Sequence, residues 1–201
     1  MKLYQADASP FARKARIVLR EAGLEGQVTE VASSGTALDP GTIRLAVNPL
    51  GKIPSLERDD APSLYDSRVI CRYLDDLGKA GLYPAAPRLW DTLTLEATAD
   101  GIMDAAVLMV YELRLRPEEI QFQDYVEAQW GKIARALDVL EDRWIAHLNG
   151  PLDIGQIAVA CALGYLDFRH GARNWRDGRG QLAAWEAKFA ERPAIAATVP
   201  T

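Results

Sequence analysis

The sequence predicts a mixed α/β unit followed by an all-helical unit. Strand and helix signals alternate over the first 77 residues, a stretch containing glycines and prolines interrupts them over residues 79–87, and nearly every later signal is helical. A chain of 201 residues is long enough for two such units, each with its own apolar face to bury. The predicted domains are therefore residues 1–78 and 88–201, joined by a linker over residues 79–87.

The first unit alternates short apolar stretches with amphipathic ones. Residues 2–6 are typical of a strand, and residues 10–22 carry a helical apolar face that stops at Gly23. The next elements are a strand, a weak helix, two short strands and a helix; they are expected at residues 27–31, 42–47, 55–57, 63–65 and 66–77. This order predicts an open sheet covered by helices.

Beyond the linker, apolar residues recur at helical spacing almost throughout. They do so over residues 89–116 and 118–147, which Pro117 separates, and again over residues 154–169 and 181–189. Asp153 and Gln156 match the capping-box pattern at the start of the third helix. We interpret this box as a folding feature and not as a site.

The composition excludes several classes of partner. A net charge of −5 gives no general attraction to nucleic acid or to an anionic membrane. No uncharged apolar run reaches the ~18–20 residues of a membrane-spanning helix, and the N-terminus lacks a secretion signal. We expect a cytoplasmic protein with no nucleic-acid or membrane partner. The basic run Arg13, Lys14, Arg16 and Arg20 is interpreted as a solvated helix face.

The cysteines and histidines indicate no metal site. Cys71 and Cys161 are far apart inside helical patterns, so we interpret both as small buried hydrophobes. They form neither a disulfide framework nor a metal-ligand spacing. His147 and His170 have no nucleophile or ligand cluster at a recognisable spacing, and we expect surface or structural roles for them.

Ser9-Pro10 is the first segment that could carry chemistry. Between a strand and a helix, Ser9 takes the N-cap position and Pro10 the first helical turn. Backbone N–H groups at a helix start carry partial positive charge, and a hydroxyl beside them can help to hold an anion, including a thiolate. The residues alone leave open the alternative that Ser9 is only a cap.

Two later segments also admit both a structural and a binding interpretation. Asp66-Ser67 begins a helix, either as a cap or as a clamp in which Asp66 binds an ammonium group and Ser67 a carboxylate. Pro54 precedes a strand, and the residues alone favour an ordinary trans bond there. A cis bond would turn the Ile53 backbone outward, where it could pair with an extended peptide.

In this order, the three segments resemble the glutathione transferase family. The resemblance covers the whole chain and rests on the motifs SPFARKAR, NPLGKIPSL, LYDSRVICRYL and DIGQIAVACALGYL, which begin at Ser9, Asn48, Leu64 and Asp153. It implies a thioredoxin-like N-terminal domain followed by an all-helical C-terminal domain. The SPFA form is similar to that of the serine-type bacterial members.

The resemblance implies how glutathione would be held. Ser9 would hydrogen-bond the sulfur as the catalytic residue. Lys52 would reach the glycine carboxylate. The Ile53 backbone, ahead of a cis Pro54, would pair with the cysteinyl backbone. Asp66 and Ser67 would hold the γ-glutamyl end. Glutathione is thus implied as a co-substrate, and no metal is implied.

A hydrophobic co-substrate pocket is expected between the Ser9 loop and the long helix after the linker. Phe11 would line its first side. Met103, Val107 and Tyr111 share one helical face, where core packing is an open alternative to pocket lining. By a looser match, Asp104 is implied to reach the γ-glutamyl group bound by the partner subunit, which requires a symmetric homodimer.

The implied activity is detoxifying conjugation of the glutathione thiolate to a small hydrophobic electrophile. One alternative is another glutathione-dependent enzyme: a thiol oxidoreductase, a dehalogenase or an isomerase. Ser9 and Ala12 stand where a redox protein has the cysteines of C-x-x-C, which argues against disulfide exchange. The alternative outside enzymes is a non-catalytic glutathione-binding or scaffold protein that keeps the fold.

Overall fold

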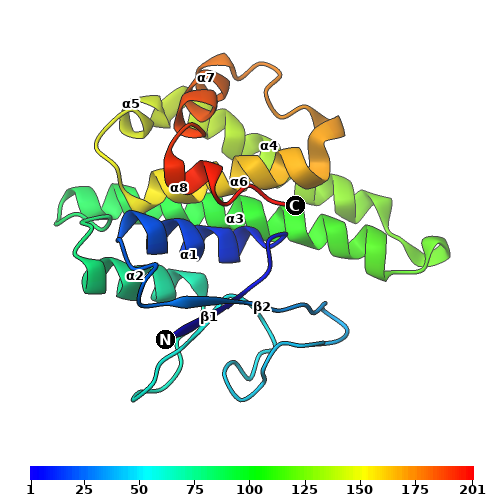
Figure 1. Cartoon of the computed structure of the whole chain (residues 1–201). Helices are drawn as coiled ribbons and strands as arrows, with labels where there is room; N and C mark the ends of the chain where they lie inside the picture. The colour runs from blue at the N-terminus through cyan, green and yellow to red at the C-terminus, as the bar shows by residue number, and fades with distance from the viewer.

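The computed structural model describes all 201 residues and places a small sheet with two helices against a bundle of further helices (Figure 1). The sheet and its helices are β1 (Lys2–Gln5), α1 (Pro10–Glu21), β2 (Thr29–Ala32), β3 (Ser55–Glu57) and α2 (Ser67–Gly78). The bundle contains α3 (Arg88–Leu115), η1 (Glu118–Ile120), α4 (Gln123–Val139), η2 (Leu140–Trp144), α5 (Ile145–Leu148), α6 (Ile154–His170), η3 (Gly171–Arg173), α7 (Gly180–Phe189) and α8 (Pro193–Ala196).

The sheet has three strands in the order β2-β1-β3. The middle strand, β1, is parallel to β2 and antiparallel to β3, so that Tyr4 lies opposite Val31 on one side and Ser55 on the other. Leu3 and Leu56 are wholly buried. The thioredoxin-like N-terminal domain and the helical C-terminal domain are confirmed.

Two predicted elements of the first unit are wrong. Residues 42–47 form turns instead of a helix, because the segment is short, lies between Gly41 and Pro49, and uses the Thr42 hydroxyl to accept a hydrogen bond from the Ser34 N–H at 2.9 Å. Residues 63–65 make only an isolated antiparallel bridge at Leu64, two residues after Pro62, which has no N–H to donate.

The two helices beside the sheet begin and end where the sequence predicts, within a residue or two. The helix α1 follows the Ser9 cap and ends before Gly23, whose φ of +65° is a left-handed conformation that favours glycine. The helix α2 ends at Gly78. Only part of its apolar side is buried: Ile70 and Leu74 are wholly buried, while Val69 is 47% exposed.

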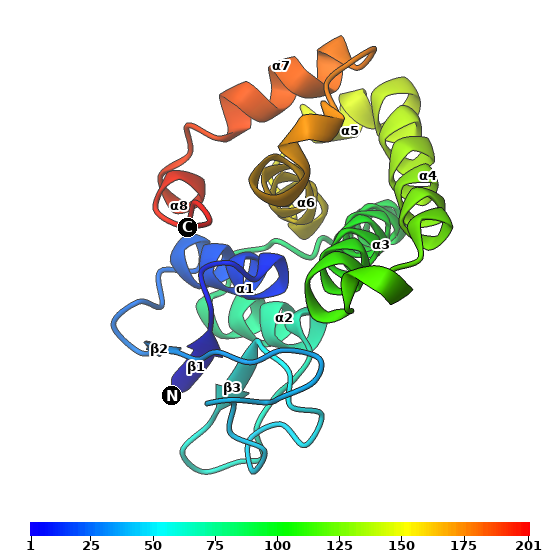
Figure 2. The ribbon, with the colours of Figure 1, turned by 90° about the vertical axis from the view of Figure 1, so that its right-hand side faces the viewer.

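The helix α6 lies at the centre of the bundle. Seen end-on in Figure 2, it is surrounded by α1, α3, α4, α7 and α8, which explains why nearly all of its residues up to Leu166 are buried. It packs most extensively against α3. A Cβ at Gly155 would approach the Leu95 side chain to 2.9 Å, so the glycine permits this close contact. No helix of the structure has the length and apolar character to cross a membrane.

The region from residue 118 to residue 147 differs from the single predicted helix. It contains the short 3-10 helix η1, the helix α4, a π-helical turn η2 and the short helix α5. Apolar spacing continues through all of these, which is why the sequence pattern does not reveal the breaks. The four-residue helix α8 was not predicted, because so short an element carries no periodic signal.

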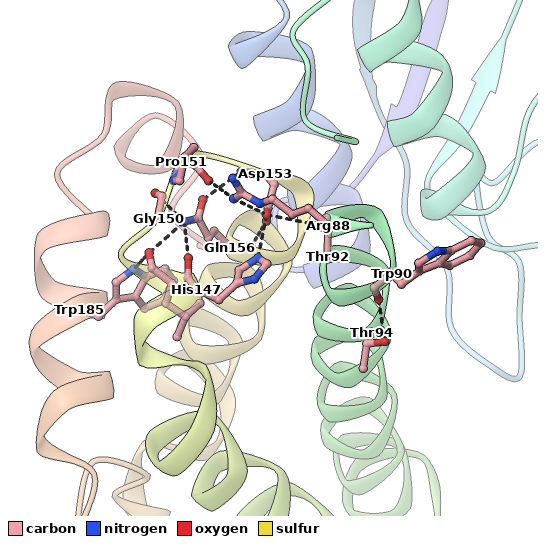
Figure 3. A network of polar contacts seen from close by, with 11 residues as sticks. Arg88, Trp90, Thr92, Thr94, His147, Gly150, Pro151, Asp153, Gln156 and Trp185 are labelled. Atoms are coloured by element: carbon pink, nitrogen blue, oxygen red, sulfur yellow. Dashed lines mark hydrogen bonds and ion pairs between the residues drawn. The ribbon is translucent and has the colours of Figure 1, made fainter. Parts of the chain in front are cut away.

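A buried polar network fixes the start of α6 (Figure 3). Asp153 and Gln156 form the predicted capping box: the Gln156 N–H donates to Asp153 Oδ1 at 3.3 Å, and the Asp153 N–H donates to Gln156 Oε1 at 2.9 Å. The second carboxylate oxygen accepts hydrogen bonds from Thr92 at 2.9 Å and Arg88 at 3.0 Å. His147 Nε2 lies 2.7 Å from the same oxygen, which gives this histidine the structural role that we expected.

Candidate active site

The sheet topology brings the three predicted binding segments to one edge. Ser9 follows β1, and β3 runs antiparallel to β1 with its first residue opposite Tyr4. The segment that ends at Pro54 therefore arrives beside the end of β1. The bridge at Leu64 is antiparallel to β3, so the chain returns past the start of β3 and reaches Asp66 at the same edge.

Ser9 is the N-cap of α1, as predicted. Its backbone is extended, with φ −88° and ψ 119°, and its Oγ accepts a hydrogen bond from the Ala12 N–H at 3.2 Å. This bond uses a lone pair of the hydroxyl oxygen and leaves the hydroxyl hydrogen without a partner in the protein. The Phe11 N–H is also unpaired. Capping therefore does not compete with donation from Ser9 to an anion in front of the helix.

Asp66 and Ser67 occupy the start of α2 in a similar way. Asp66 is the exposed N-cap, and its Oδ1 accepts a hydrogen bond from the Arg68 N–H at 3.0 Å. Ser67 is only 3% exposed, yet neither its hydroxyl nor its N–H has a partner within the protein. The turn thus offers one anionic oxygen pair and two donors, which suits the ammonium and carboxylate of an amino acid.

The segment before β3 presents an unpaired peptide unit. The Ile53–Pro54 bond is cis, as the family resemblance implied. Asn48 holds the preceding turn by donating to the Lys52 carbonyl at 2.8 Å and by accepting from the Leu50 N–H at 3.0 Å. Neither the N–H nor the C=O of Ile53 has a backbone partner, so both can pair with an extended peptide.

Asp104 on α3 lies within electrostatic range of these segments in its own chain. Partial desolvation raises the pKa of its carboxyl above the usual range although the residue is exposed, and Asp100 raises it further, while Arg68 and Lys52 act in the opposite direction. The Asp104 carboxylate therefore interacts electrostatically with charged residues of the candidate site in its own subunit. Its implied reach into a partner subunit stays a prediction.

An apolar cavity of about 620 Å³ opens beside the far end of α3. The loop after β2 forms one wall, and α3 with the start of α4 forms the other. Its lining residues are Ala37, Leu38, Leu108, Tyr111, Glu112, Leu115, Arg116, Phe122 and Tyr125. The Tyr111 and Tyr125 hydroxyls make no hydrogen bond within the protein, so an apolar ligand with one polar group would find donors there.

Of the four residues predicted for the co-substrate pocket, only Tyr111 lines this cavity. Met103 is wholly buried, so core packing, the alternative interpretation of its helical face, describes it. Phe11 and Val107 are half-buried and pack against the core. The α3 residues that line the cavity lie between Leu108 and Leu115, so they share Tyr111 with the predicted stripe and continue toward the end of the helix.

The basic run on α1 is not a solvated face. Arg13, Lys14 and Arg16 are 4%, 0% and 9% exposed. The Lys14 ammonium lies 3.0 Å from Glu96 Oε1 and 2.7 Å from Asp100 Oδ1, both on α3. The solvated interpretation failed because each of these cations has a partner inside the fold. Lys14 is neutralised across the domain boundary by residues more than 80 positions away, Arg16 pairs with Asp7 and Glu30 of its own domain, and Arg13 donates to the Ile195 carbonyl.

Both cysteines are inert structural residues, as predicted from their helical context. Each is wholly buried. Burial raises the pKa of Cys161 to about 11 and holds that of Cys71 well above its ordinary value. No thiol of the protein is therefore available for disulfide exchange at neutral pH. The structure also contains no group of three or more metal-ligating side chains.

Family models for the two halves of a glutathione S-transferase match the chain. The model of the N-terminal domain matches residues 8–77, and that of the C-terminal domain matches residues 123–188. Over the whole chain, the sequence is also 35% identical to the uncharacterized GST-like protein YibF of Escherichia coli, of which 98% is covered. The chain belongs to the glutathione transferase family. Its N-terminal match contains every predicted glutathione-binding residue except Asp104.

Solved structures of glutathione transferases agree along the full length of the fold. A family member from Pseudomonas fluorescens with bound glutathione superposes with a TM-score of 0.96 at 46% identity, covering all of this chain and 98% of that one. A glutathione S-transferase from Methylobacillus flagellatus, also with glutathione bound, gives a TM-score of 0.88 at 36% identity and covers 100% and 99% of the two chains.

Proposed function

We propose that this glutathione transferase binds glutathione with its sulfur at Ser9 and conjugates it to a small hydrophobic electrophile, as a detoxifying enzyme of the cytoplasm. The observation that carries the proposal is the unused hydroxyl hydrogen of Ser9 at the positive end of α1. The free groups of Ile53, Asp66 and Ser67 at the same edge of the sheet support it, and so do the relatives that hold glutathione.

The role of the protein in this reaction is to make the thiol anionic. A free cysteine thiol has a pKa of about 8.5, so only ~3% of it is thiolate at pH 7. A fall of about two units corresponds to ~2.7 kcal/mol of extra stabilisation of the anion. A hydrogen bond from the Ser9 hydroxyl together with the helix N-terminus is of that size.

The chemical step consumes only the two substrates, and water takes the proton. The thiol proton passes to water, and the thiolate sulfur forms a bond to the electrophilic carbon. With a chlorinated nitroaromatic, the carbon–chlorine bond then breaks and chloride leaves with the electron pair. We place the electrophile in the cavity between Leu38 and Tyr111, where the apolar walls hold its ring and the free Tyr111 hydroxyl can donate to its nitro group.

Retention and turnover together test this function. We expect purified protein to bind immobilised glutathione, to elute with free glutathione, and to form the thioether with a chlorinated nitroaromatic. A panel of epoxides, enals, aryl halides and organic hydroperoxides would then identify the electrophile class. Retention without turnover of any compound would indicate the scaffold alternative, and failure to bind glutathione would overturn the proposal altogether.

Substitution of Asp66 should separate its binding role from its capping role. Asp66→Asn keeps a good N-cap but removes the charge, so we expect glutathione affinity to fall about tenfold without a change in thermal stability. Asp66→Ala should show the same loss and in addition lose about 1 kcal/mol of stability with the cap. Isothermal titration and thermal melts give the two quantities. Normal affinity in a folded Asp66→Asn would remove Asp66 from the site.

We propose further that the protein is a symmetric homodimer with its sites near the interface. The structure supports this by the apolar and small residues along an open face of α3, where Trp90 is 64% exposed and Gly101 is exposed, and by Val69 on the neighbouring α2, which is 47% exposed. Figure 3 shows Trp90 pointing away from the bundle. Two-fold pairing is the commonest way to bury such surface.

Light scattering at micromolar concentration should therefore report about twice the chain mass of 22.1 kDa. Val69→Asp should convert the protein to a monomer, whereas Leu113→Asp, at a similarly exposed position on another face of α3, should leave it a dimer. If Asp104 serves the partner's glutathione, the monomer also loses glutathione affinity. A monomeric wild type with full activity would contradict both the dimer and this role of Asp104.

A further inference from the structure

A single carboxylate of the helical domain contacts side chains from both helices that begin at the candidate site. Asp100 on α3 is 1% exposed. Its Oδ1 accepts a hydrogen bond from Lys14 of α1 at 2.7 Å, and its Oδ2 accepts one from Arg68 Nε of α2 at 2.7 Å. Each carboxylate oxygen is thus committed to a different helix of the N-terminal domain.

The two partners of Asp100 lie close to the binding turns. Lys14 is five residues after Ser9, one helical turn beyond the α1 N-cap region, and Arg68 is two residues after Asp66 in the first turn of α2. Burial opposes the charge of Lys14, but the surrounding negative groups hold its pKa above the ordinary value. The hydrogen bond to Asp100 likewise raises the pKa of Arg68. Both cations are therefore charged at neutral pH.

We propose that Asp100 is a positioning residue that fixes the first turns of α1 and α2 relative to each other. Through Lys14 on one side and Arg68 on the other, it sets the separation between the Ser9 hydroxyl and the Asp66-Ser67 turn. This inference rests on the proposed function, in which these turns hold the two ends of the γ-glutamyl-cysteinyl unit. A misplacement of about 1 Å at such a site can cost about a hundredfold in rate.

The chain offers a matched control for this role. Glu96 is as buried as Asp100, at 3% exposure, and also binds Lys14, at 3.0 Å, but its other partner is the Tyr83 hydroxyl and not a residue of α2. Glu96→Gln and Asp100→Asn therefore remove the same charge from the same lysine. Only Asp100→Asn also releases Arg68.

Hydrogen exchange and glutathione binding test the proposal independently. In Asp100→Asn we expect the hydrogen-bonded amides of Ala12, Arg13, Arg68 and Ile70 to exchange about tenfold faster, glutathione Kd to rise about tenfold, and the pKa of the bound thiol to rise. Arg68→Gln, at a half-exposed side chain, should reproduce the change at the two α2 amides and in Kd only. Glu96→Gln should match the wild type in all three.

The outcomes distinguish a failure of the positioning role of Asp100 from a failure of the proposed function. Equal effects of Asp100→Asn and Glu96→Gln would overturn the positioning role and leave the proposed function intact. If Asp100→Asn does not fold, an unchanged Kd and unchanged exchange in Arg68→Gln overturns it instead. If the wild type binds no glutathione, the proposed function fails, while the exchange rates still decide whether Asp100 fixes the two turns.

Discussion

Ser9→Ala is expected to lower kcat roughly 25-fold at pH 7 while it changes glutathione affinity little. Suppose that the pKa of the bound thiol is about 6.5 in the wild type and rises to about 8.5 without the hydroxyl. The thiolate fraction at pH 7 then falls from about three-quarters to ~3%. The sign of the shift makes the defect pH-dependent. Because the thiol ionises by itself above its raised pKa, the loss should shrink as the pH rises toward about 9.5.

The matched variant is Ser9→Thr, which retains both a hydroxyl and a capping side chain. Ultraviolet absorbance of the thiolate gives the pKa of bound glutathione directly, and steady-state kinetics give kcat across the same pH range. Ser9→Ala should also lose about 1 kcal/mol of stability with its cap, so its folding must be checked by thermal melts. A folded Ser9→Ala with unchanged kcat and an unshifted thiol pKa would reduce Ser9 to a cap.

Asp153→Ala is expected to cause the largest loss of stability, about 3–5 kcal/mol. The carboxylate is 1% exposed and accepts from Arg88, Thr92 and the Gln156 N–H, so its removal leaves several buried donors without a partner. Arg88 and Thr92 join the start of α3 to the start of α6 through this carboxylate, so its removal affects both helices (Figure 3).

Asp76→Ala is the matched control for Asp153→Ala. Asp76 also pairs with a cation, Lys79 at 2.9 Å, but both side chains are more than three-quarters exposed. Surface pairs of this kind contribute at most about 1 kcal/mol. Urea unfolding of the two variants beside the wild type should therefore separate them clearly. A similar midpoint for Asp153→Ala and Asp76→Ala would show that the network in Figure 3 adds little.

The strong local signals of the sequence were enough to predict the long elements. Helical spacing, caps and breakers located α1, α2, α3 and α6 to within a residue or two, because each of these helices buries a continuous apolar face. The same reasoning failed where an element is short. Leu64 forms only a bridge, and residues 42–47 form turns, because so short a segment makes too few backbone hydrogen bonds to offset the cost of starting a regular element.

The contacts between the two domains could not be predicted from local sequence patterns. Lysine is usually exposed at the protein surface, and only the distant partners Glu96 and Asp100 explain why Lys14 is buried. A signal was present: the two acids are four residues apart on α3 and interrupt its apolar face. A basic run on one helix and paired acids on another could have indicated an ion-pair network between domains.

The candidate site likewise has one part that local sequence signals predict and one part that they do not. Ser9, Ile53 and Asp66 could be named as candidates because each stands at or just before a helix or strand start, where the structure leaves polar groups unpaired. The cavity depends on tertiary placement instead. Leu38 lies in a loop without periodicity, and its meeting with Tyr111 follows only from the packing of that loop against α3.

A crystal structure of the protein with glutathione tests the central claim most directly. We predict that the sulfur lies within hydrogen-bonding distance of Ser9 Oγ, that the cysteinyl backbone pairs with the Ile53 N–H and C=O, and that the γ-glutamyl group lies at Asp66 and Ser67. The same crystals, soaked with a conjugate, should place its apolar group in the cavity beside Tyr111. Glutathione bound elsewhere, or in the opposite orientation with its sulfur remote from Ser9, would contradict the account.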